Sequence, residues 1–268
     1  MTSWSDLTQE LDHWHRAGTP ATLWWRDDDV VEPTEVLARL LALAATDDLP
    51  LALAVIPAKL SPDLPPYLDA ATARITLLQH GLAHENHAPE GQKKAELGAH
   101  RPVAAVCGAL VEGSARLDAA FPESAGLARL PVLVPPWNRI APDVVTALPS
   151  LGFTGLSSFG PRDTAYPVPG LRQVNSHVDI MRWRAPRGFA GEAACLGALV
   201  GHLRARRQGD ADPSEPTGLL THHLAHDADA WDFLARLLPF LANHATIRII
   251  GAPDVFENES ENAEGSEA

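Results

Sequence analysis

Three aspartates in a row, Asp27 to Asp29, follow an apolar stretch that ends in two tryptophans and an arginine. Adjacent carboxylates repel one another unless a cation or a basic partner offsets their charge. A solvated turn or a helix cap also gathers aspartates, but the two preceding tryptophans favour a site inside the molecule. The run therefore predicts a position that binds a metal ion.

Two histidines, His80 and His84, stand four positions apart. On a helical turn this spacing places both imidazoles on one face, within reach of a single ion. Gly81 permits a tight exit from the preceding strand, and His87 adds a third imidazole. Two histidines and one aspartate leave a coordination position for water, as in catalytic zinc sites. The sequence thus predicts a divalent metal cofactor; zinc suits these ligands, and cobalt, nickel and iron also bind them.

Hydrolysis is the chemistry that such a site supports. A metal lowers the pKa of bound water, a neighbouring carboxylate can take the proton, and an imidazole can protonate the leaving group. Asp27 and Asp28 are the candidates for the base, and His222 and His223 are the candidates for the acid.

The elements that position these residues alternate between short β-branched stretches and longer stretches of helical period, a pattern typical of an α/β fold with a parallel sheet. Polar residues follow the predicted strands at their carboxyl ends, where loops converge in such folds. Predicted strands cover residues 21–26, 51–57, 74–79, 131–135, 155–159, 172–177, 218–222 and 246–250, and predicted helices cover residues 33–48, 103–121, 142–151, 191–207 and 230–244.

Composition narrows the class of protein. A formal net charge of -13, without a basic stripe, excludes a nucleic-acid partner. No run of about 20 apolar residues predicts a membrane span, and the amino terminus lacks the pattern of a signal peptide. We expect a cytoplasmic protein with two unpaired cysteines, a single catalytic domain over residues 1–256, and a disordered acidic tail over residues 257–268.

The order of these residues resembles that of the polysaccharide deacetylases, the NodB-homology group related to carbohydrate esterase family 4. The family's Thr-Phe-Asp-Asp-Gly motif is similar to the segment from Arg26 to Val30, and its His-Ser/Thr-x-x-His motif is similar to the segment from His80 to His84. Later motifs have counterparts in Val134 to Trp137, in His177 to Ile180 with Trp183 nearby, and in Leu220 to His222.

The resemblance implies a distorted (β/α) barrel and a deacetylase that acts on a carbohydrate or another small molecule. It implies that the second aspartate of the first motif and the two histidines bind the metal, that the first aspartate is the base, and that the late histidine is the acid. With Arg26 at the threonine position, Asp28 is the base, Asp29 is the metal ligand and His222 is the acid. A shift of one residue would name Asp27 and Asp28 instead; we favour the first register.

This chain departs from the family pattern at several positions. Val30 stands in place of the motif glycine, Gly81 in place of the serine or threonine, and Val134 in place of the arginine that orients the base. Arg26 or Arg139 can substitute for that arginine. Candidates for the substrate pocket or for supporting the ligands are Asp27, Arg26, His87, Trp137, Arg139, His177, Asp179 and His223.

Two other functions remain open on the sequence. Relatives with the same metal triad hydrolyse amides or imides that are not sugars. A carbohydrate-binding descendant without catalysis would also keep the fold, although a complete ligand set favours an enzyme.

Overall fold

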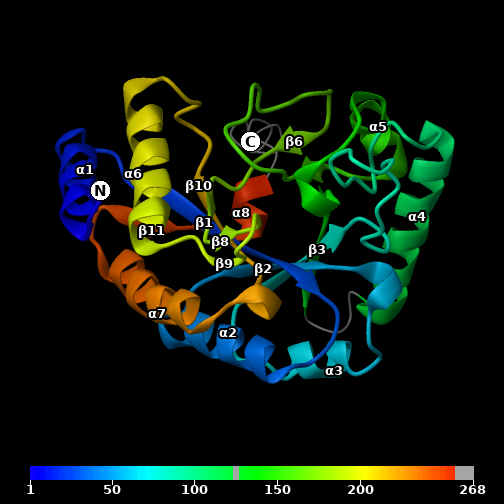
Figure 1. The fold of residues 1–268 in the computed structure, drawn as a ribbon, viewed down its shortest axis with the longest axis horizontal. Coiled ribbons are helices and arrows are strands. Elements are labelled where there is room, and N and C mark those ends of the chain that lie inside the picture. Colours follow the sequence, from blue (N-terminus) through cyan, green and yellow to red (C-terminus); the bar gives the residue numbers. More distant parts are fainter. Residues whose placement is uncertain (123–126, 257–268) are drawn as a thin grey trace, which may run out of the picture.

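The fold is a curved sheet of nine strands surrounded by helices, described by a computed structural model for residues 1–122 and 127–256 (Figure 1). All neighbouring strands in this sheet run parallel, in the order β6-β5-β4-β3-β2-β1-β10-β7, and β11 pairs with the amino-terminal half of β1. The sheet strands are β1 (Ala21–Val30), β2 (Leu51–Val55), β3 (Ile75–His80), β4 (Ala128–Val134), β5 (Gly155–Leu156), β6 (Arg172–Gln173), β7 (Val178–Asp179), β10 (Thr217–Thr221) and β11 (Ile247–Ile249), and a separate hairpin joins β8 (Met181–Arg182) to β9 (Gly188–Phe189).

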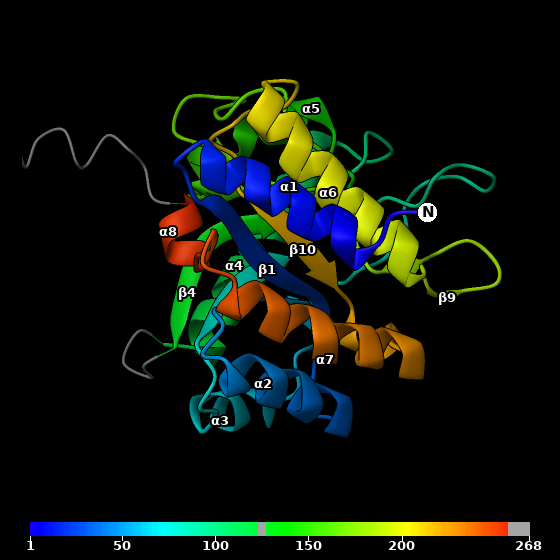
Figure 2. The same cartoon turned by 90° about the vertical axis from the view of Figure 1, so that its left-hand side faces the viewer.

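Helices cover the outer face of the sheet. Figure 2 shows α1 beside α6, and α7 beside α2, in front of β1 and β10. The α-helices are α1 (Trp4–Arg16), α2 (Glu35–Thr46), α3 (Leu64–Asp69), α4 (Val103–Ala120), α5 (Pro142–Ala147), α6 (Glu192–Gln208), α7 (Ala228–Asn243) and α8 (Ala252–Phe256), and the 3₁₀ helices are η1 (Pro57–Lys59), η3 (Pro136–Asn138), η4 (Leu148–Leu151) and η5 (His223–Ala225).

Strand β1 separates two hydrophobic clusters because side chains alternate along a strand. Leu23 and Trp25 pack outward against the helices, in the largest cluster. Trp24 points to the other face and packs edge-on against Phe256 of α8, with ring centroids 5.7 Å apart. Helix α8 therefore fills the concave side of the sheet at the end away from the carboxyl edge of β1.

The predicted fold class is confirmed: the chain forms an α/β structure of the distorted (β/α) barrel type. The predicted helices correspond to α2, α4, α5 with η4, α6 and α7. The predicted strand over residues 172–177 is too long, because β6 ends at Gln173 and β7 begins only at Val178.

The structure also bears on several smaller features of the chain: its first helix, its cysteines, its membrane-spanning potential and its tail. Helix α1 was not predicted, although its buried Leu7, Leu11 and Trp14 recur with helical spacing. Cys195 is buried, Cys107 is half-buried, and both are free. No helix in the described part of the chain is long and apolar enough to cross a bilayer. The predicted acidic tail, residues 257–268, lies outside the described residues.

Candidate active site and metal centre

A cavity of about 840 Å³ opens at the carboxyl edge of the sheet. Its residues come from segments far apart in the sequence, as expected where the carboxyl ends of parallel strands meet. The lining consists of Asp28, Asp29, His80, His84, Lys93, Lys94, Trp137, Asn138, Arg139, Phe159, Asp179, Trp183, Arg187 and His222.

A bulge in β1 gives Asp29 its direction. The pairing with β2 shifts register between Asp27 and Val30, and Asp29 has a φ of 70°. In a regular strand Asp27 and Asp29 would point to the same face, but a bulge re-aims the side chain that follows it. Asp28 and Asp29 consequently both line the cavity, whereas Asp27 does not.

Asp29, His80 and His84 bring three candidate ligand atoms together, all within 4.8 Å of one another. Asp29 Oδ1 lies 3.2 Å from His80 Nε2 and 3.3 Å from His84 Nε2. The expected helical turn between the histidines is wrong: Gly81 and His84 have φ values of 58° and 52°, and residues 81–102 contain no helix. An irregular turn, which glycine permits, achieves the convergence instead.

Backbone contacts hold this turn in place. His80 Nδ1 lies 3.0 Å from the Val134 carbonyl oxygen. A carbonyl only accepts hydrogen bonds, so Nδ1 carries the hydrogen and Nε2 presents its lone pair to the cavity. The buried Glu96 carboxylate accepts hydrogen bonds from Leu82 N at 3.3 Å and Ala83 N at 2.8 Å. Trp137 packs against the His84 ring, with centroids 4.2 Å apart.

The three residues fit a divalent cation. Asp29 Oδ1 is buried and has no hydrogen-bond partner among the described residues. It faces the lone pair of His80 Nε2, so a positive charge is required between them. Burial alone would lower the pKa of His80, but the close Asp29 and Asp28 carboxylates raise it, so this position favours a positive charge. Burial lowers the pKa of His84, which favours the neutral form that binds metals.

Asp28 is paired with Arg26, two residues earlier on the same strand and the same face. Arg26 Nε lies 2.8 Å from Asp28 Oδ1, and its second terminal nitrogen donates to Oδ2 at 3.0 Å. Arg26 also donates to the carbonyl of Ser157 at 3.1 Å and to Asn138 Oδ1 at 2.9 Å. The guanidinium therefore fixes the Asp28 carboxylate by two contacts, which is the role that Val134 cannot fill.

His222 reaches the cavity from the end of β10. Its Nε2 lies 3.9 Å from Asp28 Oδ2, and its Nδ1 lies 4.0 Å from Asp179 Oδ1. Trp183 donates to Asp179 Oδ2 at 2.7 Å and contacts the His222 ring edge-on. Burial raises the pKa of Asp179, although the charge of His222 opposes this. Asp28, His222 and Asp179 thus form a chain of ionisable groups along the cavity.

Asp27 faces the opposite side of β1 and binds the segment that follows His222. It accepts hydrogen bonds from Thr221 Oγ1 at 2.7 Å, from His223 N at 3.0 Å, and from His223 Nδ1 at 2.5 Å. Burial alone would raise the pKa of Asp27, but His223 lowers it; burial would lower the pKa of His223, but Asp27 raises it. Asp27 and His223 therefore form a buried ion pair that anchors η5 behind the cavity.

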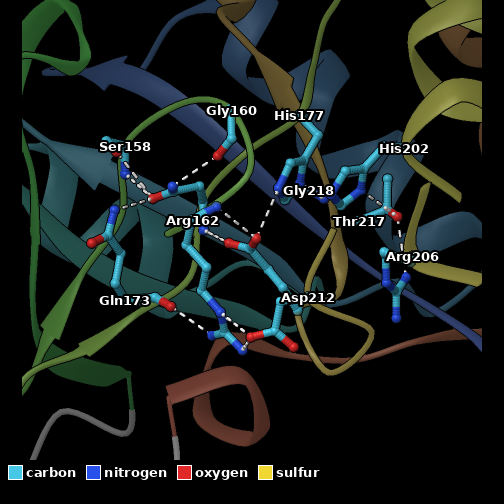
Figure 3. A network of polar contacts seen from close by, with 12 residues as sticks. Ser158, Gly160, Arg162, Gln173, His177, His202, Arg206, Asp212, Thr217 and Gly218 are labelled. Carbon is cyan, nitrogen blue, oxygen red and sulfur yellow. Dashed lines mark hydrogen bonds and ion pairs between the residues drawn. The ribbon is translucent and has the colours of Figure 1, made fainter. Parts of the chain in front are cut away.

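His177 does not line the cavity; it belongs to a network near the opposite end of β10 (Figure 3). His177, His202 and Glu215 also bring potential ligand atoms within 4.8 Å. However, His177 Nδ1 accepts a hydrogen bond from Gly218 N at 2.9 Å, so its Nε2 carries the hydrogen and faces Glu215 at 3.3 Å. A metal would need that nitrogen deprotonated, and the network is therefore structural.

Of the remaining residues that the sequence suggested, some line the cavity and one does not. Trp137 and Arg139 line the cavity, and His87 does not. Sequence reasoning missed five lining residues. Four of them lie outside any motif, and the fifth, Asn138, directly follows a motif segment; the five are Lys93, Lys94, Asn138, Phe159 and Arg187. The rarity of lysine in this chain is the one sequence signal that could have drawn attention to the first two.

Comparisons with known proteins rest on structure alone: no family model matches the sequence, and no curated protein matches it. A protein from Mycobacterium smegmatis assigned as a polysaccharide deacetylase superposes with a TM-score of 0.61 at 14% identity, covering 92% of each chain. A peptidoglycan N-acetylglucosamine deacetylase gives 0.52 at 12% identity, covering 96% of this chain and 97% of that one. A mutant of a CE4 family pseudoenzyme gives 0.55 at 11%, covering 89% and 68%.

These similarities define the fold as that of the polysaccharide deacetylases, the NodB-type distorted barrel also found in CE4 family proteins. At identities this low the likeness concerns the fold, because one fold can carry different functions.

Proposed function

We propose that this protein is a metal-dependent hydrolase that removes the acetyl group from an N-acetylated sugar. The observation that carries the proposal is the convergence of the ligand atoms of Asp29, His80 and His84 beside Asp28 and His222 in one cavity. A divalent ion held by these three ligands would act as a Lewis acid on the amide carbonyl and would lower the pKa of water.

Asp28 is the proposed general base. Its carboxylate lies in the cavity and is only 1% exposed. The two contacts with Arg26 leave it little freedom to rotate. A base held in this orientation takes a proton from the attacking water as the oxygen bonds to the acetyl carbon.

His222 is the proposed general acid. Its Nε2 is directed toward Asp28, while Asp179 faces Nδ1 and orients the ring. As the carbon–nitrogen bond breaks, Nε2 donates a proton to the sugar nitrogen, and the products are acetate and the free amine. Asp179 and Trp183 act through His222 as positioning residues.

Fold alone does not separate enzymes from inactive relatives, since one similar structure is described as a pseudoenzyme. Three features of this chain favour an enzyme: the ligand set is complete, the proposed base has an arginine partner, and a carboxylate lies 4.0 Å from Nδ1 of the proposed acid. A binding descendant would not require all three arrangements.

The test measures acetate released from N-acetylglucosamine and its oligomers by metal-loaded protein. Asp28→Asn and His222→Gln should each lower kcat by roughly 10²- to 10⁴-fold, the usual contribution of a general base or acid, with metal content unchanged. His87→Gln, outside the cavity, is the matched control and should retain activity. Hydrolysis of ring amides without release of acetate from any sugar would replace this proposal with an amidase function.

A further inference from the structure

The cavity carries positive charge that the proposed hydrolysis does not use. Four basic side chains line it and come from loops around the sheet edge; no carboxylate of the described residues lies within ion-pair distance of any of them. We call this group the basic rim; it consists of Lys93, Lys94, Arg139 and Arg187.

Lysine distribution sets the basic rim apart from an ordinary surface. The chain has only three lysines, and Lys93 and Lys94 both belong to the rim. The third, Lys59, follows Ala58, whose backbone N–H donates to the Leu82 carbonyl at 2.8 Å, in the turn between the two histidines. Two of the three lysines therefore line the cavity, and the third lies next in sequence to a residue that contacts the metal-site turn.

The acidic residues of the cavity already have partners, so they leave the basic rim available. Asp28 contacts Arg26, Asp29 contacts the two metal-site histidines, and Asp179 accepts from Trp183. The chain as a whole carries a formal charge of -13. A local cluster of cations in an acidic protein attracts anions to that cluster and not to the rest of the surface.

Aromatic side chains accompany the cations. Trp137 lies under Lys94, with Nζ 5.9 Å from the ring centroid, and Arg139 donates to the Lys94 carbonyl at 2.8 Å. On another part of the lining, Phe159 and Trp183 are 46% and 43% exposed. Flat apolar faces beside cations suit a ring that carries a negative group.

We propose that the substrate is an anionic N-acetyl sugar, whose acetamido group enters the metal site while its phosphate or carboxylate contacts the basic rim. This inference rests on the proposed deacetylase function and specifies its substrate class. Lysine and arginine bind both kinds of anion, so phosphate and carboxylate are separated by experiment.

The kinetic test compares kcat/KM for N-acetylglucosamine, its 1-phosphate and 6-phosphate esters, and N-acetylmuramic acid at low ionic strength. The kcat/KM for the preferred anionic sugar should exceed that for the neutral sugar by roughly tenfold or more, and added salt should reduce this ratio. Lys93→Glu and Lys94→Glu should each reduce the ratio of anionic to neutral kcat/KM by roughly tenfold. Preference for an ester identifies phosphate, and preference for N-acetylmuramic acid identifies carboxylate.

Arg248→Glu is the matched control. It makes the same change in net charge on β11, which pairs with the amino-terminal end of β1, away from the cavity. Its ratio of anionic to neutral kcat/KM should equal that of the wild type. Equal kcat/KM on neutral and anionic sugars, or an equal loss of the ratio in Arg248→Glu, would overturn the inference and leave the deacetylase proposal intact.

A binding measurement keeps the two proposals separate. Calorimetry with glucosamine and glucosamine 6-phosphate reports on anion recognition even if no acetate is released from any sugar, an outcome that would remove the deacetylase proposal alone. Tighter binding of the phosphate ester, weakened in Lys93→Glu and unchanged in Arg248→Glu, supports the basic rim as an anion site. Equal binding of the two compounds, together with no preference for acidic over neutral N-acetyl sugars, contradicts it.

Discussion

Arg26 and Asp28 lie two residues apart on β1 and contact each other on the concave face of the sheet, with Arg26 Nε 2.8 Å from Asp28 Oδ1. Alternation along the strand places both side chains on this face. The partner of the proposed base therefore comes from its own strand and not from the end of β4, where Val134 stands.

Removal of this arginine should affect both stability and catalysis. Arg26→Met leaves Asp28 buried without its partner, and breaking such a pair typically costs about 3–5 kcal/mol. Urea unfolding should show this loss, and the double variant Arg26→Met, Asp28→Asn should recover part of it. Arg26→Lys keeps the charge but cannot make both contacts. An unchanged free energy of unfolding in Arg26→Met would show that the ion pair is not important.

The sequence predicted which residues form the site, but not the backbone geometry that directs their side chains. A run of aspartates after an apolar strand, two spaced histidines and a late histidine were enough to place Asp28, Asp29, His80, His84 and His222 at one sheet edge, because parallel strands end there together. A regular strand would have turned Asp29 away. The bulge that re-aims it depends on pairing with β2, which no local pattern encodes.

Tertiary contacts account for the other differences. The spacing of His80 and His84 fits a helix, but Glu96 fixes a different turn. Its carboxylate accepts hydrogen bonds from the backbone amides of Leu82 and Ala83, which lie fourteen and thirteen residues earlier in the sequence. Lys93, Phe159 and Arg187 have no motif, and only the fold brings their loops to the cavity.

Gly81 should tolerate no side chain. Its φ is 58°, and an added Cβ would lie 2.7 Å from Pro136 Cγ and collide with the Glu96 carboxylate. Gly81→Ala should cost roughly 1–2 kcal/mol for the left-handed backbone and about 1–3 kcal/mol more for the overpacking, and it should weaken metal binding.

Gly152→Ala is the matched control for this change, since Gly152 has a φ of 89° and no atom within 4 Å of its added Cβ. Thermal unfolding and metal titration of both variants separate the two costs. Equal destabilisation of the two, with metal affinity retained, would contradict the role given to the turn.

The Asp27–His223 pair should make stability depend on pH. The pKa of His223 is raised from 6.5, so its contribution is complete below about pH 6.5 and is lost as the pH rises through the raised value. The pKa of Asp27 is lowered from 3.8, so its contribution is present above that value and is lost as the pH falls through the lowered one. The pair contributes most between these limits.

His223→Gln should therefore lose more unfolding free energy at pH 5.5 than at pH 8.5, measured with urea at both values. The exposed His100 supplies the control His100→Gln, for which no such difference is expected. A loss independent of pH would mean that the two residues are joined by a neutral hydrogen bond.

The metal content of the protein and its variants tests most directly which of the three aspartates binds the metal ion. Asp29 faces both histidines, Asp28 faces Arg26, and Asp27 faces His223. Elemental analysis of the purified protein and of Asp27→Asn, Asp28→Asn and Asp29→Asn should show about one divalent ion per chain in the wild type and the first two variants. We predict that only Asp29→Asn loses the ion; retention of the ion in Asp29→Asn, with loss in Asp28→Asn, would contradict the assignment.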